Sequence, residues 1–276
     1  MLKQRIATAA VLLPVFLIVV FWFSTPWFAV ALSLVVLIGA VEWAALVGVK
    51  DRIHQLLWLF VFCALLLIFW VAREKTTLFL VMAGSIWWAV ALLRLWTAPA
   101  TPEPAWFRSI AAAITLVPAW ASLVYLHQAE VKLVIAVFLI VWLADTGAYF
   151  CGRSLGKRKL APLISPGKTI EGVLGGIVAV VIFAAAGAAW TGVGPDCGSA
   201  WVGICVATAL VSVVGDLWES KLKRIAGAKD SGALLPGHGG VLDRIDSVTA
   251  AAPVFVTGLY LVNVGTPLCG STIGHM

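Results

Sequence analysis

Nine long, nearly uncharged stretches divide this chain of 276 residues, and they constrain its fold more than any other feature. A bilayer core about 30 Å thick takes about 20 apolar residues per helical span. Hydrophobic residues make up 62% of the chain and charged residues only 12%, so water is not its main solvent. The stretches lack the period-two alternation of barrel strands. The sequence therefore predicts an all-α, polytopic integral membrane protein with helices at 6–23, 27–47, 54–72, 77–96, 109–126, 131–151, 172–191, 200–218 and 247–265.

The basic residues predict how these helices are oriented. Cytoplasmic loops of membrane proteins carry an excess of lysine and arginine. With the N-terminus inside, all but three of the 19 basic residues fall on the cytoplasmic side, the exceptions being Arg73, Lys75 and Lys132. We therefore predict an N-in, C-out topology. For Lys50, Arg52, Arg94 and Arg108, a role in topology alone is the preferred interpretation.

The first stretch is interpreted as a span rather than a cleaved signal peptide. It is longer than the usual apolar region of a signal peptide, and no small-residue cleavage site follows it at residues 22–24.

Two connections, residues 152–170 and 219–246, are much longer than the others, and both are predicted to be cytoplasmic. Connections longer than about 12–15 residues tend to be functional or disordered. Their glycines, lysines and aspartates favour function. We therefore expect a C-terminal set of membrane helices, 109–276, to carry the chemistry, and residues 1–108 to form N-terminal membrane helices.

The second connection follows a polar stripe. If the eighth helix continues through Arg224, its positions i, i+3, i+4 and i+7 share one face. This stripe could hold a metal ion and a phosphate together, and consists of Asp216, Glu219, Ser220 and Lys223. The alternative is an ordinary solvated face for Glu219, Arg224 and Asp230, and it is the preferred interpretation for Lys221.

The segment before the ninth helix is rich in glycine. Residues 236–240 cannot form regular helix, and Gly239 and Gly240 would let backbone N–H groups approach an anion. Asp243 and Asp246 then stand three apart at a helix start, where phosphate is also favoured. Together with Asp216 they form a candidate Mg²⁺ site, since Mg²⁺ prefers oxygen ligands. For Asp246 a simple N-cap is the alternative.

The first connection contributes other candidates. Asp145 lies in an otherwise apolar span, where a carboxylate is costly and indicates function, with helix–helix hydrogen bonding as the alternative. Ser165 followed by proline has the form of a helix N-cap. Lys168 and Thr169 would then occupy the first helical turn, where an anion is favoured.

Taken together, the segment from Ser220 to Asp246 resembles the signature of the phosphatidate cytidylyltransferase family, also called CDP-diacylglycerol synthases. Segments 145–152 and 165–172 are also similar to family segments, so the resemblance is strong over the C-terminal half. The first hundred residues resemble the family only as generic membrane helices, apart from Glu42 and Trp43 in the second span as a shared pair. The fixed positions of the signature are Ser220, Lys223, Arg224, Lys229, Asp230, Gly232, His238, Gly239, Gly240, Asp243, Arg244 and Asp246.

The resemblance implies a homodimeric enzyme of the bacterial inner membrane whose site faces the cytoplasm. It implies transfer of the cytidylyl group of CTP to phosphatidic acid, with Mg²⁺ as cofactor and no nucleic acid partner. The implied metal ligands are Asp216, Asp243 and Asp246. The expected phosphate contacts are Lys168, Lys223, Arg224 and Arg244, with Ser220 as a polar partner. Further candidates are His238, whose role in phosphate contact, proton handling or turn structure stays open, and the substrate-binding set Ser165, Thr169, Lys229, Gly239, Gly240 and Asp145.

Two other functions stay open. A CTP-dependent polyprenol kinase would pass on the γ-phosphate and release CDP. An ion-coupled transporter would use Glu42, Asp145 and Asp216 as marks of an ion path, although it would have no need of a long, lysine-rich glycine loop.

Overall fold

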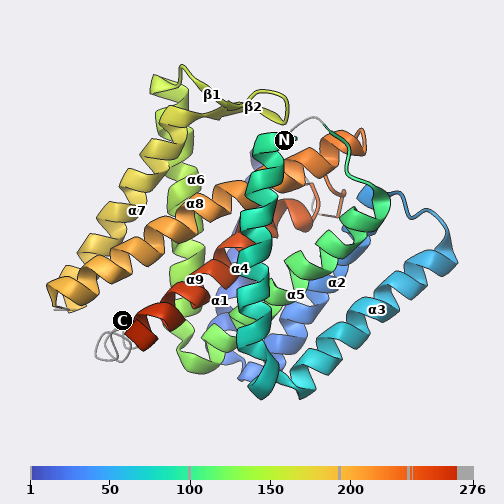
Figure 1. Cartoon of the computed structure of the whole chain (residues 1–276), viewed down its shortest axis with the longest axis horizontal. Helices are drawn as coiled ribbons and strands as arrows, with labels where there is room; N and C mark the ends of the chain where they lie inside the picture. The colour runs from blue at the N-terminus through green and yellow to red at the C-terminus, as the bar shows by residue number, and fades with distance from the viewer. Residues whose placement is uncertain (1, 99–100, 192–193, 235–236, 238, 266–276) are drawn as a thin grey trace.

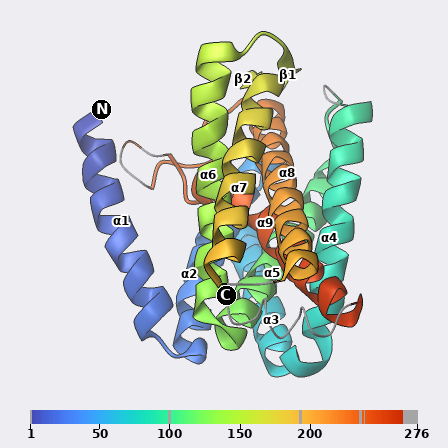
Figure 2. The same cartoon turned by 90° about the vertical axis from the view of Figure 1, so that its left-hand side faces the viewer.

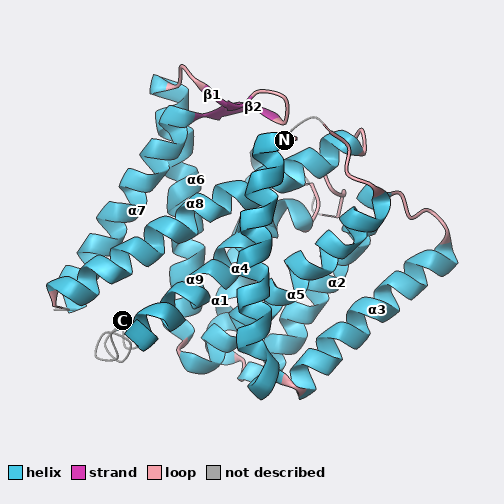
Figure 3. Cartoon of the chain, in the orientation of Figure 1, coloured by secondary structure: helices cyan, strands magenta, loops and turns pink. Residues whose placement is uncertain are grey.

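All nine predicted stretches form helices in the computed structural model, which describes residues 2–98, 101–191, 194–234, 237 and 239–265 (Figures 1 and 3). Within these residues, eight helices are long and apolar enough to cross a membrane, and the apolar part of the first, Ala10–Trp22, is shorter. The all-α, polytopic class is therefore confirmed. The elements are α1 (Leu2–Trp22), α2 (Thr25–Val47), α3 (Arg52–Val71), α4 (Arg73–Thr97), α5 (Ala105–Ala129), α6 (Val131–Leu155), β1 (Lys159–Ala161), β2 (Ser165–Thr169), α7 (Ile170–Thr191), α8 (Pro195–Ile225) and α9 (Leu242–Gly265).

The two long connections lie in the same half of the molecule (Figures 1 and 2). The β1–β2 hairpin stands at one end, and the chain that leads from α8 to α9 lies on that side of the bundle. Helix α1 begins at the hairpin end, and α9 ends toward the opposite end (Figure 2). This arrangement agrees with both connections sharing one side of a membrane, whereas the identity of that side stays a prediction.

Glycines let two pairs of helices pack at very short range. A Cβ atom on Gly147 of α6 would lie 2.7 Å from the carbonyl oxygen of Gly175 in α7. In the same way, a Cβ on Gly215 of α8 would lie 2.5 Å from the carbonyl oxygen of Asp246 in α9. Small residues allow such close approach of membrane helices. The second contact brings Asp216 beside the first turns of α9.

Two predicted helix starts need correction. Ser165 does not cap a helix, because residues Ser165–Thr169 form β2, which pairs antiparallel with β1. The cap is instead Thr169, whose Oγ1 accepts a hydrogen bond of 3.1 Å from the N–H of Gly172 in the first turn of α7. The N-cap alternative for Asp246 is also wrong, since α9 begins four residues earlier, at Leu242.

The N-terminal helices share one buried apolar cluster with α9. Trp88 of α4 is buried and donates from its indole N–H to the carbonyl oxygen of Thr249 in α9 at 3.1 Å. Trp43 of α2 donates in the same manner to the carbonyl oxygen of Arg108 in α5 at 3.0 Å. Buried tryptophans usually find such partners. Packing around α9 thus depends on residues far upstream in the chain.

Candidate functional site

The polar stripe on α8 is present as predicted. Helix α8 continues to Ile225, and Ser220 Oγ donates to Asp216 Oδ1 at 3.3 Å. One turn further on, Lys223 Nζ donates to Glu219 Oε2 at 2.7 Å. Both contacts join residues four apart, which face each other on a helix.

Lys168 reaches this stripe from the hairpin. Its Nζ lies 2.5 Å from Asp216 Oδ2, and the two side chains are 25% and 30% exposed. The lysine belongs to β2 and not to the first turn of α7, so the predicted helical position for it is wrong. Asp145 of α6 lies close enough for its charge to interact with Asp216 and Lys168. Three segments far apart in sequence therefore meet at Asp216.

Lys223 joins the stripe to α9. Its Nζ lies 2.6 Å from Asp243 Oδ1, and both side chains are largely buried. The other oxygen, Asp243 Oδ2, accepts from the N–H and Oγ of Ser231, each at 2.9 Å, and from the N–H of Gly240 at 2.8 Å. The connection thus folds back over the start of α9. The N–H of Gly240, predicted to be open to a phosphate, is occupied by Asp243.

Asp246 lies among other carboxylates. Its charge interacts with those of Asp216 and Glu219. Glu219 Oε1 is buried without a hydrogen-bond partner. In the described segments no three histidine, cysteine, aspartate or glutamate side chains form a group that could hold a metal ion. A cation among Asp216, Glu219 and Asp246 would relieve the repulsion between their charges and give the buried Glu219 oxygen a partner. Asp243 instead faces Lys223.

The other predicted residues are distributed around this centre. Arg224 donates to the carbonyl oxygens of Ile164 at 3.4 Å and Ala228 at 3.5 Å, so it contacts both long connections. Lys229 and Arg244 are exposed. Gly239 has a φ of +81°, and a Cβ there would lie 2.7 Å from Asp243 Oδ2, so glycine is required. His238 lies outside the described residues.

Lys221 lies in a different environment from the solvated one predicted for it. Its side chain is buried, and Nζ donates to the carbonyl oxygen of Ala98 at 2.8 Å and to Glu103 Oε1 at 3.0 Å. The connection between α4 and α5 supplies both acceptors from more than a hundred residues upstream. A solvated loop face, the preferred interpretation, is therefore wrong.

Two further residues contact the site although the sequence did not predict it: Glu42 and Ser231. Glu42 of α2 accepts from the N–H groups of Val241 and Leu242, and Ser231 contacts both Glu42 and Asp243. For Glu42 a signal existed, since it is a carboxylate in an apolar span. Its hydrogen bonds to the start of α9 give it a role other than marking an ion path. Ser231 carried no such signal.

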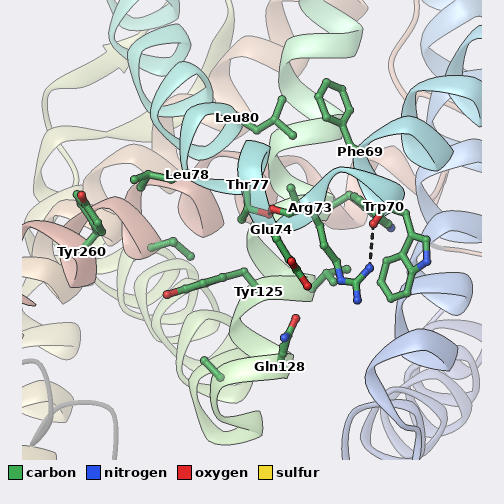
Figure 4. A pocket seen from close by; sticks show the side chains of 15 residues that line it. Phe69, Trp70, Arg73, Glu74, Thr77, Leu78, Leu80, Tyr125, Gln128 and Tyr260 are labelled. Atoms are coloured by element: carbon green, nitrogen blue, oxygen red, sulfur yellow. Dashed lines mark hydrogen bonds between the residues drawn. The ribbon is translucent and has the colours of Figure 1, made fainter.

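A cavity of about 420 Å³ lies away from these residues (Figure 4). It is lined by side chains from α3, α4, α5 and α9, among them Trp70, Arg73, Tyr125 and Tyr260. Arg73 donates to the carbonyl oxygen of Trp70 at 3.0 Å. None of the predicted site residues lines this cavity, so its volume does not identify the site.

Comparison with known proteins gives long matches. Residues 3–262 match the sequence model of the Cytidylyltransferase family. A phosphatidate cytidylyltransferase of Pseudomonas aeruginosa is 42% identical over 97% of this chain and 100% of that protein. One from Haemophilus influenzae is 37% identical over 92% of the chain and 97% of its own length. One from Staphylococcus aureus is 46% identical over 44% of the chain and 46% of its length.

Proposed function

Because the chain belongs to the cytidylyltransferase family, we propose that it transfers the cytidylyl group of CTP to phosphatidic acid, giving CDP-diacylglycerol and pyrophosphate. The observation that carries this proposal is the convergence of two lysines on neighbouring carboxylates. Lys168 of β2 contacts Asp216, and Lys223 of α8 contacts Asp243. Cations held in this way can bind the phosphates of a nucleotide and of a lipid side by side.

The residues suit a reaction that consists mainly of positioning and charge neutralisation. A phosphate oxygen of phosphatidic acid attacks the α-phosphorus of CTP, and the bond from that phosphorus to the bridging oxygen breaks as pyrophosphate leaves. Such transfer needs no covalent protein nucleophile. Lys168 and Lys223 would exchange their carboxylate contacts for phosphate oxygens. Asp216 and Asp243 hold the two lysines in place before the substrates bind.

Mg²⁺ belongs to this proposal. Asp216 and Asp246 would hold it, with Glu219 beside them, and substrate phosphates would complete its oxygen ligands. The unpaired buried oxygen of Glu219 and the charge interactions among these carboxylates support that set. Asp243, also a ligand in the family-based prediction, could join them once Lys223 has turned from it to a substrate phosphate. Bound Mg²⁺ supplies positive charge that offsets the charge of the reacting phosphates.

The proposal places the enzyme in the bacterial inner membrane with this site toward the cytoplasm. The excess of basic residues and the shared end of the two long connections support the orientation. A single cysteine placed at an exposed position of either connection, in a background freed of native cysteines, should resist membrane-impermeant reagents in intact cells. Labelling of both from outside would reverse the orientation. A homodimer is proposed on the family resemblance alone.

The assay that tests the reaction uses purified protein in lipid nanodiscs. Incubation with phosphatidic acid and CTP labelled in its α-phosphate should give labelled CDP-diacylglycerol and unlabelled pyrophosphate. A CTP-dependent lipid kinase would release labelled CDP, which would contradict the proposal. So would an absence of any lipid-dependent turnover.

A further inference from the structure

Glu42, on α2 in the N-terminal part of the chain, reaches the segment that carries the candidate site. Its side chain is buried, and Oε1 accepts from the N–H of Val241 at 3.0 Å. Oε2 accepts from the N–H of Leu242 at 2.7 Å and from Ser231 Oγ at 3.1 Å. These partners stand 189 to 200 residues further along the chain.

Glu42 supplies the hydrogen-bond acceptor and the negative charge that the start of α9 lacks. The first N–H groups of a helix have no acceptor within the helix, and the partial positive charge there favours an anion. Helix α9 begins at Leu242, whose N–H donates to Glu42. A carboxylate from another helix thus caps α9 and fixes where it begins. The positions of Asp243 and Asp246 follow from that start.

The neighbouring backbone is shaped around this carboxylate. A Cβ atom on Gly232 would lie 2.5 Å from Glu42 Oε1, and one on Gly240 would lie 2.5 Å from Oε2. Real Cβ atoms do not approach oxygen so closely. At Gly240 the Ser231 Oγ would lie nearer still, so the two glycines leave room for Glu42 and for its contact with Ser231.

Ser231 connects Glu42 to the site. Its Oγ lies 3.1 Å from Glu42 Oε2 and 2.9 Å from Asp243 Oδ2. A serine hydroxyl has one proton to donate, so it serves one of these oxygens at a time, while the N–H of Ser231 also donates to Asp243. Asp243 in turn holds Lys223. The contacts run without a gap from Glu42 to Lys223.

We propose that Glu42 is a positioning residue for the cytidylyl transfer, holding Ser231 and the start of α9 so that Asp243 keeps Lys223 in place. The inference rests on the proposed function. Glu42 acts through its neighbours and does not contact the substrate.

Glu42→Gln tests this role in the purified, full-length protein in nanodiscs. The amide keeps the volume but turns an N–H₂ group toward backbone donors, leaving a buried N–H unsatisfied. We expect kcat at saturating substrates to fall at least about tenfold. Backbone amides of residues 240–245 should exchange hydrogen at least about tenfold faster, because their local opening becomes easier. Glu42→Asp keeps the charge, so it should recover part of the lost kcat and part of the lost protection from exchange. If Glu42→Gln does not fold, the same two measurements are made on Glu42→Asp.

His127→Gln is a matched control, since it also removes buried polar contacts, in this case between α5 and the first two helices. His127 is buried and hydrogen-bonded to Thr25 Oγ1 at 3.1 Å and to the carbonyl oxygen of Val20 at 3.0 Å. It should lower the Tm while leaving kcat within about twofold and the exchange of residues 240–245 unchanged.

The outcomes separate the two proposals. If Glu42→Gln loses activity only in step with Tm, as a globally destabilised variant would, Glu42 has no positioning role. Faster exchange with unchanged kcat also overturns that role. If wild-type protein makes no CDP-diacylglycerol but Glu42→Gln still speeds exchange at residues 240–245, the proposed reaction fails while the anchoring of α9 by Glu42 is supported.

Discussion

The two long connections each contribute to contacts with α8, but they are anchored by different means. Glu171 holds the hairpin, residues 157–169, by accepting from the N–H groups of Lys157 at 3.0 Å and Arg158 at 3.1 Å. It also pairs with the Arg158 side chain, which is 67% exposed. These partners are at most 14 residues apart in sequence. Glu171 therefore anchors the hairpin through contacts that are local in sequence.

The connection from α8 to α9, residues 226–241, depends on buried carboxylates. Asp243 is 7% exposed in its side chain and accepts from Ser231 and Gly240. Glu42 binds the same segment from α2. Exposed ion pairs contribute little to stability, whereas breaking a buried charged contact is costly. Two equally polar loops are therefore expected to tolerate substitution very differently.

Asp243→Asn should have the largest effect. The change keeps the volume of the side chain but removes the charge that holds Lys223 and accepts three hydrogen bonds from Ser231 and Gly240. We expect kcat/KM to fall at least about a hundredfold, comparable to the loss of one preorganised transition-state contact. Steady-state kinetics on nanodisc samples checks this, with a circular-dichroism spectrum to show retained helix.

The same substitution at an exposed aspartate provides the control for Asp243. Asp51→Asn changes a helix cap whose oxygen accepts from the N–H groups of Ile53 and His54. Because asparagine also caps helices well, activity should stay within about twofold. If Asp243→Asn keeps near-full activity, the connection from α8 to α9 tolerates substitution as well as the exposed hairpin does.

Lys168→Ala should have the next largest effect, although its hairpin is the more tolerant region for folding. The Lys168 side chain pairs with Asp216 and is 25% exposed, so its ammonium group is open to a phosphate. We expect the KM for CTP to rise about tenfold or more, as for a lost charge-assisted phosphate contact. Lys159→Ala, at an exposed position of β1, should leave the KM unchanged. Equal effects of the two substitutions would reduce Lys168 to a topology residue.

Glu171→Gln should have the smallest effect. It weakens the contacts with Lys157 and Arg158, but the β1–β2 pairing and the Thr169 cap remain. We expect kcat/KM to fall less than about fivefold, in the range of a surface ion pair. The effect should shrink at high salt, since exposed pairs are screened. A loss as large as that of Asp243→Asn would remove the distinction between the two regions.

The features predicted well from the sequence are those that depend on neighbouring residues. Apolar run length identified the spans, and helical spacing placed Asp216 beside Ser220 and Glu219 beside Lys223. The α8 helix continued to Ile225 as required. These patterns are local, so a single sequence contains them in full.

The features missed depend on distant partners. Lys221 appears solvated in sequence because its acceptors, Ala98 and Glu103, lie far upstream. Ser165 followed by proline suggested a helix cap, but pairing with β1 and the Thr169 cap favour an extended strand. Glu42 stands out as a carboxylate in an apolar span, yet nothing nearby in sequence indicates that it meets Ser231. Tertiary contacts of this kind override local preference.

The anchoring of α9 by Glu42 has a consequence for how the protein is made. Ribosomes add about 5 to 20 residues per second, so Glu42 enters the membrane about 10 to 40 s before its partners, 189 to 200 residues later, are synthesised. An unpaired carboxylate at the centre of a span is costly in that interval. Glu42 stands five residues before the end of α2 at Val47, about 8 Å along the helix. The nascent helix can therefore keep the charge near the lipid headgroups until the hydrogen-bond partners of Glu42 have been made.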